Sequence, residues 1–240
     1  FKSNDAVRVT FNTLSMNFCF ILITVLISVG LALVMYRFSA RKVKIFQTCM
    51  FVPYFISWVV ASYVVYALLC PDIGALSILC KNLGLSIPNF YNTPQYWRII
   101  MPVAYLWKNV GYMTLLYYAT LLGMETHLLE AAAIDGATEK QRIWYIMLPF
   151  LKPTIVLMVL LQVGKIFNAD FGMFYFLPRN SGTLYPVTDV IDTYVYRALR
   201  VTGDVGMASA MGLFQTIAGF TILYVINSVV RKIDRDNALY

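Results

Sequence analysis

The sequence is poor in charged residues. Only 13% of its 240 residues are Asp, Glu, Lys or Arg, and 60% are hydrophobic, whereas soluble domains carry about 25% charged residues. This composition excludes water as the solvent for most of the chain. The formal net charge is +7, but the basic residues lie between long apolar runs rather than in one stripe. They therefore indicate membrane topology and not a nucleic-acid partner.

The sequence also lacks a P-loop, the glycine-rich segment that wraps nucleotide phosphates with backbone amides. Its Gly164-Lys165 pair has Val159 where the first glycine of the motif belongs and Ile166 where the hydroxyl residue belongs. We therefore expect no hydrolysis of ATP by this chain.

Catalytic and metal-binding side chains are equally scarce. His127 is the one histidine and has no Cys or second His nearby, which argues against a metal site and favours a plain helix-start residue. No Ser, His and Asp set can be assembled. Asp189 and Asp192 have helical spacing, which we interpret as a solvated helix face rather than a general acid and base. The sequence thus predicts no enzyme, and no metal or cofactor bound by this chain.

Long apolar runs are what the sequence does contain. A helix that crosses a bilayer needs about 20 residues, and inside lipid its backbone groups must be bonded within their own segment. Two of the five runs are interrupted by a lysine, Lys108 or Lys165. We predict an all-α, polytopic membrane protein whose residues 1–240 form a single domain, with spans at about 12–36, 46–70, 97–122, 150–170 and 205–230, a loop at 124–149 and an external segment at 171–204.

Lysines and arginines are distributed unevenly between the two sides of the predicted membrane. Short loops rich in these residues stay in the cytoplasm. The denser side, which we predict to be cytoplasmic, has Arg37, Arg41, Lys42, Lys44, Lys140, Arg142, Lys152, Arg231, Lys232 and Arg235, and the other side has Lys2, Arg8, Lys81, Arg98, Arg179, Arg197 and Arg200.

The start of the chain bears on the number of spans. Five spans with a cytoplasmic C-terminus place residue 1 outside, and the Phe1 to Thr10 stretch has neither a start methionine nor the zones of a signal peptide. We therefore expect one further span upstream and six in the intact polypeptide. On the same external side, Cys70 and Cys80 could form a disulfide, but nothing in their spacing enforces it, so we favour free thiols.

The loop at 124–149 is predicted to form two short helices. Ala131 to Ala133 have high helix propensity, Thr126 can cap the first helix, and Gly136 can end it in a left-handed conformation. Thr138 and Gln141 match a capping box that starts the second helix. Its apolar face then consists of Ile143, Trp144, Ile146 and Met147.

This loop resembles the EAA loop of type I ABC importer permeases. It reads Glu130-Ala131-Ala132-Ala133-Ile134-Asp135-Gly136-Ala137 and ends in Leu148-Pro149, similar in identity and spacing to the Glu-Ala-Ala, Asp-Gly-Ala and Leu-Pro pattern of that family. Ile143 departs from the pattern, in which an aromatic residue is usual. The resemblance covers nearly the whole chain, since Phe11-Asn12-Thr13 and Leu106-Trp107-Lys108-Asn109-Val110-Gly111 look like the maltose-type sugar permeases and Asp189 to Tyr196 like their oligosaccharide branch.

The resemblance implies a permease subunit in a bacterial cell membrane that passes a sugar, such as an oligosaccharide or polysaccharide fragment, inward by alternating access. It implies as partners a second permease subunit in a heterodimer, two ATP-binding subunits that use ATP and Mg, an extracellular solute-binding protein and the lipid bilayer. In the family the loop is a coupling helix that lies in a groove of the ATPase. The coupling residues carried over by match are Glu130, Ala131, Ala132, Asp135, Gly136, Ala137, Leu148 and Pro149.

Polar residues near the predicted spans suggest where a solute could pass. A charge inside a span is costly unless it faces water or a partner, so Lys108 marks a candidate pathway. Sugars bind to amides, charged groups and aromatic faces, and the alternative is that such residues pack the bundle and bond across helices. The candidates are Lys108, Asn109, Tyr112, Asn168, Asp170, Phe171 and Tyr175.

Other interpretations stay open. The loop could be a capped helix against lipid headgroups, although its acidic residues would be repelled by an anionic leaflet. An amphipathic helix expected at 188–199 could contact a solute-binding protein or seal the bundle. The chain could also be an ion-coupled secondary carrier, with Lys108 and Asp170 as coupling residues, an importer permease for a non-sugar solute, or a membrane-embedded enzyme or receptor subunit.

Overall fold

The computed structural model describes residues 4–84 and 88–233, which form helices and connections with no strand among them. Lys2 and Arg235, which entered the charge count, lie outside the described residues. The chain divides into two compact units. Unit 1 comprises Phe1–Phe20, Ile56–Tyr105 and Gly164–Thr221, and unit 2 comprises Ile21–Phe55, Leu106–Val163 and Ile222–Tyr240. The three longest helices, α1 (Asn4–Met35), α5 (Pro94–Leu122) and α12 (Val205–Ile233), each contribute one part to each unit.

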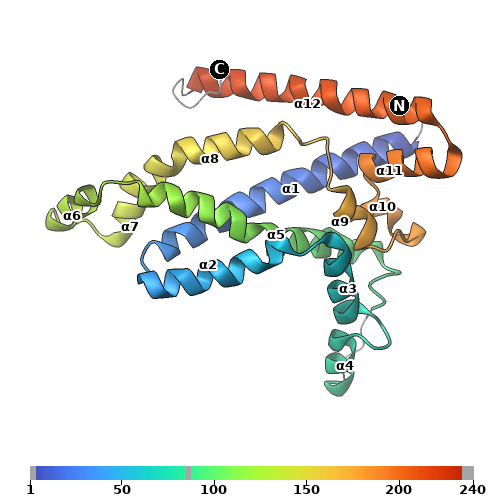
Figure 1. The fold of residues 1–240 in the computed structure, drawn as a ribbon, viewed down its shortest axis with the longest axis horizontal. Coiled ribbons are helices and arrows are strands. Elements are labelled where there is room, and N and C mark those ends of the chain that lie inside the picture. The colour runs from blue at the N-terminus through green and yellow to red at the C-terminus, as the bar shows by residue number, and fades with distance from the viewer. Residues whose placement is uncertain (1–3, 85–87, 234–240) are drawn as a thin grey trace. The chain divides into compact units, whose positions relative to one another are not determined.

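Unit 1 is built around two tryptophans and a set of buried aliphatic and aromatic side chains. Trp97 and Met101 of α5 and Met173 of α9 are fully buried, and Trp58 packs in the same cluster. Unit 1 holds the short helices α3 (Trp58–Leu69), α4 (Ala75–Asn82), α9 (Phe171–Phe176), α10 (Tyr185–Thr188) and α11 (Ile191–Arg197), with a 3-10 turn at Gly182–Leu184 and a π turn at Ala198–Thr202 (Figure 1). Within it α3 packs against both α4 and α9.

Unit 2 contains α2 (Ala40–Phe55), α6 (Thr126–Ile134), α7 (Glu139–Arg142), a π turn at Ile143–Met147 and α8 (Leu148–Val163). Tyr117 and Leu121 of α5, Ala32 of α1 and Leu151 of α8 are its most buried core residues. The backbones of α5 and α2 touch, because a Cβ on Gly111 would lie 2.0 Å from the carbonyl oxygen of Met50. Only glycine fits at this crossing.

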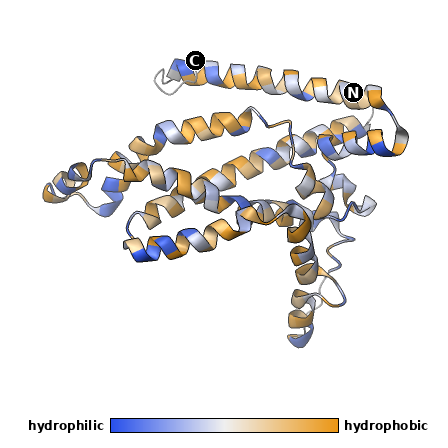
Figure 2. Cartoon of the chain, in the orientation of Figure 1, coloured by the Kyte–Doolittle hydropathy of each residue, from blue (hydrophilic) through white to orange (hydrophobic). Residues whose placement is uncertain are grey.

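Three helical segments of the described chain are long and apolar enough to cross a membrane, namely Asp5–Met35, Glu139–Val163 and Val205–Lys232. Ala40–Phe55 and Trp58–Leu69 meet the same criterion only when counted together. Although α5 has 29 residues, it is not one of these segments in the described chain, and it includes Arg98 and Lys108. The predicted all-α membrane fold agrees with this, and the count of five spans stays a prediction. Figure 2 shows apolar residues along the long helices and hydrophilic ones at the start of α2 and in α7.

Two predicted helices end earlier than expected. The segment 46–70 is not one continuous helix, because α2 stops at Phe55 and α3 begins at Trp58. The Ser57 side chain caps α3 by accepting from the Val60 N–H at 3.3 Å. The helix predicted to reach residue 170 ends at Val163, so Lys165 lies in a turn after it and not late in the span. Gly219 of α12 comes so close to this turn that a Cβ would lie 2.9 Å from the Gly164 oxygen.

Cys70 and Cys80 are both free, Cys70 buried and Cys80 partly buried, so no disulfide joins them.

Candidate functional site

The loop at 124–149 forms two helices joined by a tight turn in unit 2. Gly136 has φ +79°, the left-handed conformation predicted for it. The N–H groups of Ala137 and Gly136 donate to the carbonyls of Ala132 (2.9 Å) and Ala133 (3.1 Å). This pair of bonds is a Schellman motif, which satisfies carbonyls at the end of α6 and turns the chain into α7.

The predicted capping box at the start of α7 is confirmed. The Gln141 side chain accepts from the Thr138 N–H at 2.7 Å, and Thr138 Oγ1 accepts from the Gln141 N–H at 3.4 Å. The predicted cap of the first helix is wrong, because α6 begins at Thr126 and its N-cap is Glu125, whose side chain makes no capping bond. Glu125 Oε2 instead lies 3.1 Å from His127 Nε2, so the carboxylate has a local partner in the first turn.

The second helix does not stop within the loop. Glu139–Val163 is one helical run, with a π turn at Ile143–Met147. Met147 is buried and Ile143 packs on the core of unit 2, but Trp144 is 68% exposed and Tyr145 is 78% exposed. The predicted apolar face is therefore correct for Ile143, Ile146 and Met147, which pack on the core, and wrong for Trp144, which is exposed.

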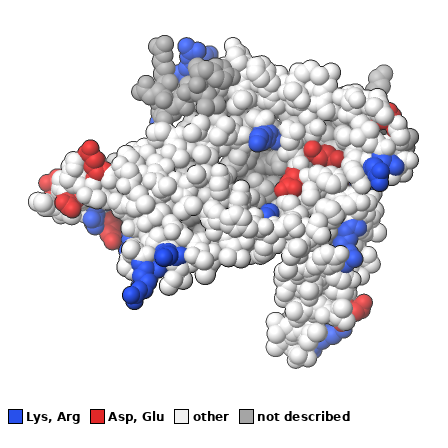
Figure 3. Space-filling view, viewed as in Figure 1, with Lys and Arg blue, Asp and Glu red and all other residues white. Residues whose placement is uncertain are grey.

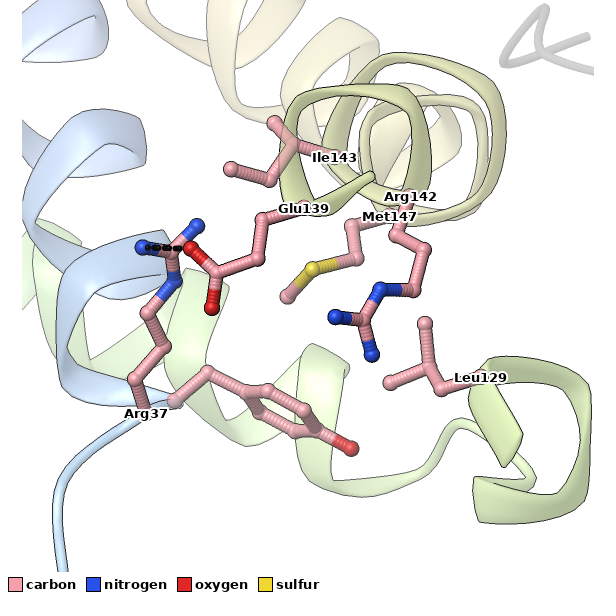
Figure 4. Close-up of a pocket in the computed structure, with 7 residues that line it drawn as sticks. Arg37, Leu129, Glu139, Arg142, Ile143 and Met147 are labelled. Atoms are coloured by element: carbon pink, nitrogen blue, oxygen red, sulfur yellow. Dashed lines mark ion pairs between the residues drawn. The ribbon is translucent and has the colours of Figure 1, made fainter. Parts of the chain in front are cut away.

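An ion pair joins this loop to the connection between α1 and α2. Arg37 Nη1 lies 2.9 Å from Glu139 Oε2 at the edge of a pocket of about 210 Å³. Figure 4 shows the Glu139 carboxylate directed toward Arg37 and the Arg142 side chain extending beside Leu129. The pocket is lined by Tyr36, Arg37, Leu129, Glu139, Arg142, Ile143 and Met147. The sequence argument counted Arg37 only for topology, and no local signal pointed to its partner.

The outer face of α6 is open. No residue of α6 is buried, and Ile134 at its end is 87% exposed. Of the predicted coupling residues, Glu130, Ala131, Asp135, Gly136 and Pro149 are exposed, and Ala132, Ala137 and Leu148 are half-buried. Figure 3 shows acidic side chains gathered where Figure 1 places α6 and α7. The loop thus presents small, acidic and apolar side chains together on an accessible, internally capped surface.

Three of the predicted solute-contact residues lie on α5 in unit 2. Lys108 Nζ donates to the carbonyl oxygen of Tyr54 at 2.7 Å and approaches that of Pro53 at 3.5 Å. Tyr112 stacks on the Tyr54 ring, with centroids 4.9 Å apart, and Asn109 is half-buried. The last carbonyls of a helix lack partners within it and attract cations. Lys108 therefore caps α2 where that helix stops.

The other four lie in unit 1 around the start of α9. Asp170 is the N-cap of α9, with Oδ1 accepting from the Met173 N–H at 3.2 Å and Oδ2 accepting from the Trp58 indole N–H. Phe171 and Tyr175 stack with centroids 5.0 Å apart. These interactions build an aromatic cluster with a buried tryptophan bonded to a carboxylate.

Asn168 is exposed and belongs to the turn before α9. Its carbonyl accepts from Asn17 Nδ2 at 3.1 Å, and the same amide donates to Ile166 at 2.7 Å. The seven candidates therefore form two groups, one in each unit, and a role in solute contact stays a prediction for both.

Sequence reasoning missed a buried polar network in unit 1. Asp189 is 2% exposed and pairs with Arg197, while Thr193 Oγ1 donates to it at 2.9 Å. Arg8 of α1 lies 3.8 Å from its second oxygen, and Asn12 donates to its backbone carbonyl at 3.0 Å. The predicted solvated face is wrong, because Asp189 is buried among Arg197 and Thr193 of its own segment and Arg8 and Asn12 of α1.

Asp192 is also withdrawn from water. Its Oδ2 accepts from the Ala169 N–H at 2.7 Å and from Gln215 Nε2 at 3.2 Å. Burial raises the pKa of this carboxyl above its ordinary value, and the hydrogen bonds from Ala169 and Gln215 oppose that shift. Asp192 thus ties α11 to the turn before α9 and to α12.

Known proteins are similar to this chain in sequence. The family described as "Binding-protein-dependent transport system inner membrane component" matches residues 25–237. Protein LplB of Bacillus subtilis (strain 168) is 28% identical over 190 residues, 79% of this chain and 59% of its own length. The polygalacturonan/rhamnogalacturonan transport system permease protein YteP of the same strain is 30% identical over 189 residues, covering 79% and 58%. The chain thus spans about six tenths of the length of these relatives.

A solved structure has the same fold. One chain of a bacterial alginate ABC transporter, crystallised in complex with an alginate pentasaccharide-bound periplasmic protein, is 29% identical to this chain with a TM-score of 0.91. The alignment covers 97% of this chain and 81% of that one.

Proposed function

The chain belongs to the family of binding-protein-dependent transport system inner membrane components, and from this premise we propose that it is the permease subunit of an ATP-driven importer. It passes a sugar, in the form of an oligosaccharide or polysaccharide fragment, into the cytoplasm of a bacterium. Two relatives support this solute class, since one is a permease for polygalacturonan or rhamnogalacturonan and the other belongs to an alginate transporter.

The observation that carries the proposal is the construction of the loop at 124–149. Both helix ends that face each other are capped by the loop's own residues, through the Schellman motif at Gly136 and the capping box at Thr138. An element that satisfies its own backbone bonds can keep its shape while its outer face stays free for a partner. The exposed Glu130 offers a carboxylate to a basic partner, and Ala131 permits close approach.

The partners follow from this role. Two ATP-binding subunits, which use ATP and Mg, dock on the loops of this chain and of a second permease subunit. A solute-binding protein delivers the sugar from outside. Because α7 continues through the π turn into α8 as one helical run, a displacement of the docked loop moves a membrane helix directly. Closure of the ATPases then reorients the bundle and opens the solute pathway inward.

The test is Gly136→Ala, with Gly30→Ala as the matched control. A Cβ meets no atom within 4 Å at either glycine, but Gly136 has φ +79°. A non-glycine residue there costs about 1–2 kcal/mol, which deforms the turn without a clash. We expect Gly136→Ala to lower ATP-driven uptake and the amount of ATPase retained on a tagged permease roughly tenfold, and Gly30→Ala to change neither.

The same experiment separates the proposal from an ion-coupled carrier. An importer requires ATP and loses transport when the turn is deformed. Uptake that follows an ion gradient without ATP, or that is indifferent to Gly136→Ala while no ATPase copurifies, contradicts the proposal.

A further inference from the structure

A pocket in unit 1 lies apart from the coupling loop and is lined by aromatic and polar side chains. It has a volume of about 230 Å³ and lies between the start of α3 and the turn after α9. This is smaller than the roughly 300–1,000 Å³ of sites for drug-sized ligands, so it has room for one ring and not for a chain. Its lining residues are Val59, Ser62, Tyr63, Tyr175, Phe176, Arg179 and Asn180.

The backbone at this pocket is strained. Arg179 and Asn180 have φ 55° and 49°, and they are the non-glycine residues with positive φ in the described part of the chain. Asparagine tolerates this region, but arginine has no such preference. Bonds from Arg179 N to Phe176 O (3.1 Å) and from Asn180 N to Tyr175 O (3.0 Å) hold the turn. Glycine would adopt it more easily, so the strain points to a use for the guanidinium.

The guanidinium of Arg179 is placed to receive an anion. It lies over the Tyr66 ring, 4.1 Å from the ring centroid. Stacking occupies the flat face of a guanidinium and leaves its N–H donors in the plane available to a carboxylate. Arg8 and Arg197 of the same unit each pair with an aspartate, but Arg179 has no carboxylate within ion-pair distance among the described residues.

The other walls of the pocket suit a sugar ring. Tyr63 is 64% exposed, so its ring is available as an apolar face, and Tyr175, whose ring is fixed by stacking on Phe171, forms part of another wall. Asn180 Oδ1 accepts from the Tyr185 hydroxyl at 3.0 Å. This bond orients the amide, whose nitrogen remains a donor for a hydroxyl group.

We propose that this pocket is a subsite for an anionic sugar residue, a uronate, within the transported saccharide. Arg179 binds the carboxylate through paired N–H donors, Tyr63 and Tyr175 pack on the ring, and Asn180 donates to a ring hydroxyl. This inference rests on the proposed function and adds to it the class of sugar and the residues that select it.

The experiment measures ATPase stimulation of the complete importer, with its solute-binding protein, in phosphatidylcholine nanodiscs. The probes are trigalacturonate and its methyl ester, in which a methyl group neutralises each carboxyl while the sugar rings and their linkages stay the same. We expect Arg179→Gln to raise the half-maximal concentration of trigalacturonate about tenfold or more, the effect of losing one charge-assisted bidentate contact. The same variant should leave the half-maximal concentration of the ester unchanged. Arg200→Gln, which neutralises another exposed arginine of unit 1, is the control and should change nothing.

Two further variants keep the test decisive if Arg179→Gln assembles poorly. Arg179→Lys retains the charge and loses the paired donors, so we expect an intermediate shift for trigalacturonate. Tyr63→Ala removes an exposed ring with little effect on folding and should weaken both probes several-fold. Unchanged responses to trigalacturonate in all three variants, or a wild-type preference for the ester, overturn the uronate subsite and leave the importer intact.

Two further outcomes would have a cause other than the loss of a uronate contact, and the experiment distinguishes them from it. If the wild-type importer responds to no saccharide, the proposed function itself fails and this inference falls with it. If the Arg179→Gln effect appears only when phosphatidylglycerol is added to the nanodiscs, the anion at Arg179 is a lipid phosphate, and the uronate subsite is overturned.

Discussion

The loop at 124–149 and the segment at 171–204 are both long connections, and different kinds of bond hold them. In the loop, the capping box and the Schellman motif join residues a few positions apart. In the segment, the Asp189 carbonyl accepts from Asn12, and the Ile191 N–H donates to Thr13 at 3.0 Å, across 177 and 178 residues. A connection whose own residues satisfy its backbone hydrogen bonds can leave one face free for a partner. A connection that is hydrogen-bonded to distant side chains is instead packed into its unit.

The sharpest test of this contrast is the removal of the buried carboxylate from the segment. We expect Asp189→Ala to destabilise the protein by about 3–5 kcal/mol, because it leaves Arg197 without its buried partner. Asp5→Ala is the matched control, since Asp5 also pairs with Arg8, at 2.8 Å, but is exposed, and such pairs contribute about 0–1 kcal/mol. Thermal unfolding in detergent measures both. Equal shifts would mean that the network does not hold the segment.

A smaller and local effect is expected in the loop. Thr138→Ala removes one half of the capping box and should cost about 1 kcal/mol, confined to α6 and α7. Thr126→Ala is the control, because Thr126 lies at the start of α6 without acting as its cap. Hydrogen exchange should show faster exchange of the α7 amides in Thr138→Ala only, with the unfolding midpoint nearly unchanged. A loss of global stability would show that the loop is not self-contained.

The smallest effect concerns Asp192 and depends on pH. Burial raises the pKa of this carboxyl in the folded state, so the folded protein binds its proton more tightly than the unfolded chain. The buried charged carboxylate lowers the stability of the folded protein. This loss of stability is absent below the unfolded pKa of about 4, and it develops as pH rises through the folded pKa. Asp192→Asn should therefore match the wild type in acid and exceed it slightly at neutral pH, by about 1 kcal/mol or less. The test is to measure the unfolding midpoints of the wild type and Asp192→Asn from pH 4 to 7. An advantage of the variant that becomes smaller as pH rises contradicts a raised pKa for Asp192.

The parts of the fold that depend on neighbouring residues could be predicted from the sequence. The left-handed turn at Gly136 and the capping box at Thr138 are fixed by residue types at short spacing, and both are confirmed. The long apolar runs gave an all-α membrane fold for the same reason. Trp144 was assigned to the wrong face because its apolar character does not tell the core side of this helix from the exposed side.

Features that depend on distant partners could not be predicted. Asp189 has the spacing of a solvated helix face, and only the folded chain brings Arg8 and Asn12 to it. Lys108 was singled out as a charge inside a span and a candidate pathway residue, which stays a prediction. The α2 carbonyls to which it donates are free to accept because that helix stops at Phe55. Pro53 and Ser57 were the signals that could have indicated this break.

The contact between Gly111 and the Met50 carbonyl has a mechanical consequence for unit 2. Where two backbones touch, no flexible side chain lies between them to adjust to a movement. Sliding one helix along the other would push side chains of α5 against the peptide groups of α2. The two helices therefore move together at this crossing, and a displacement of one is transmitted directly to the other.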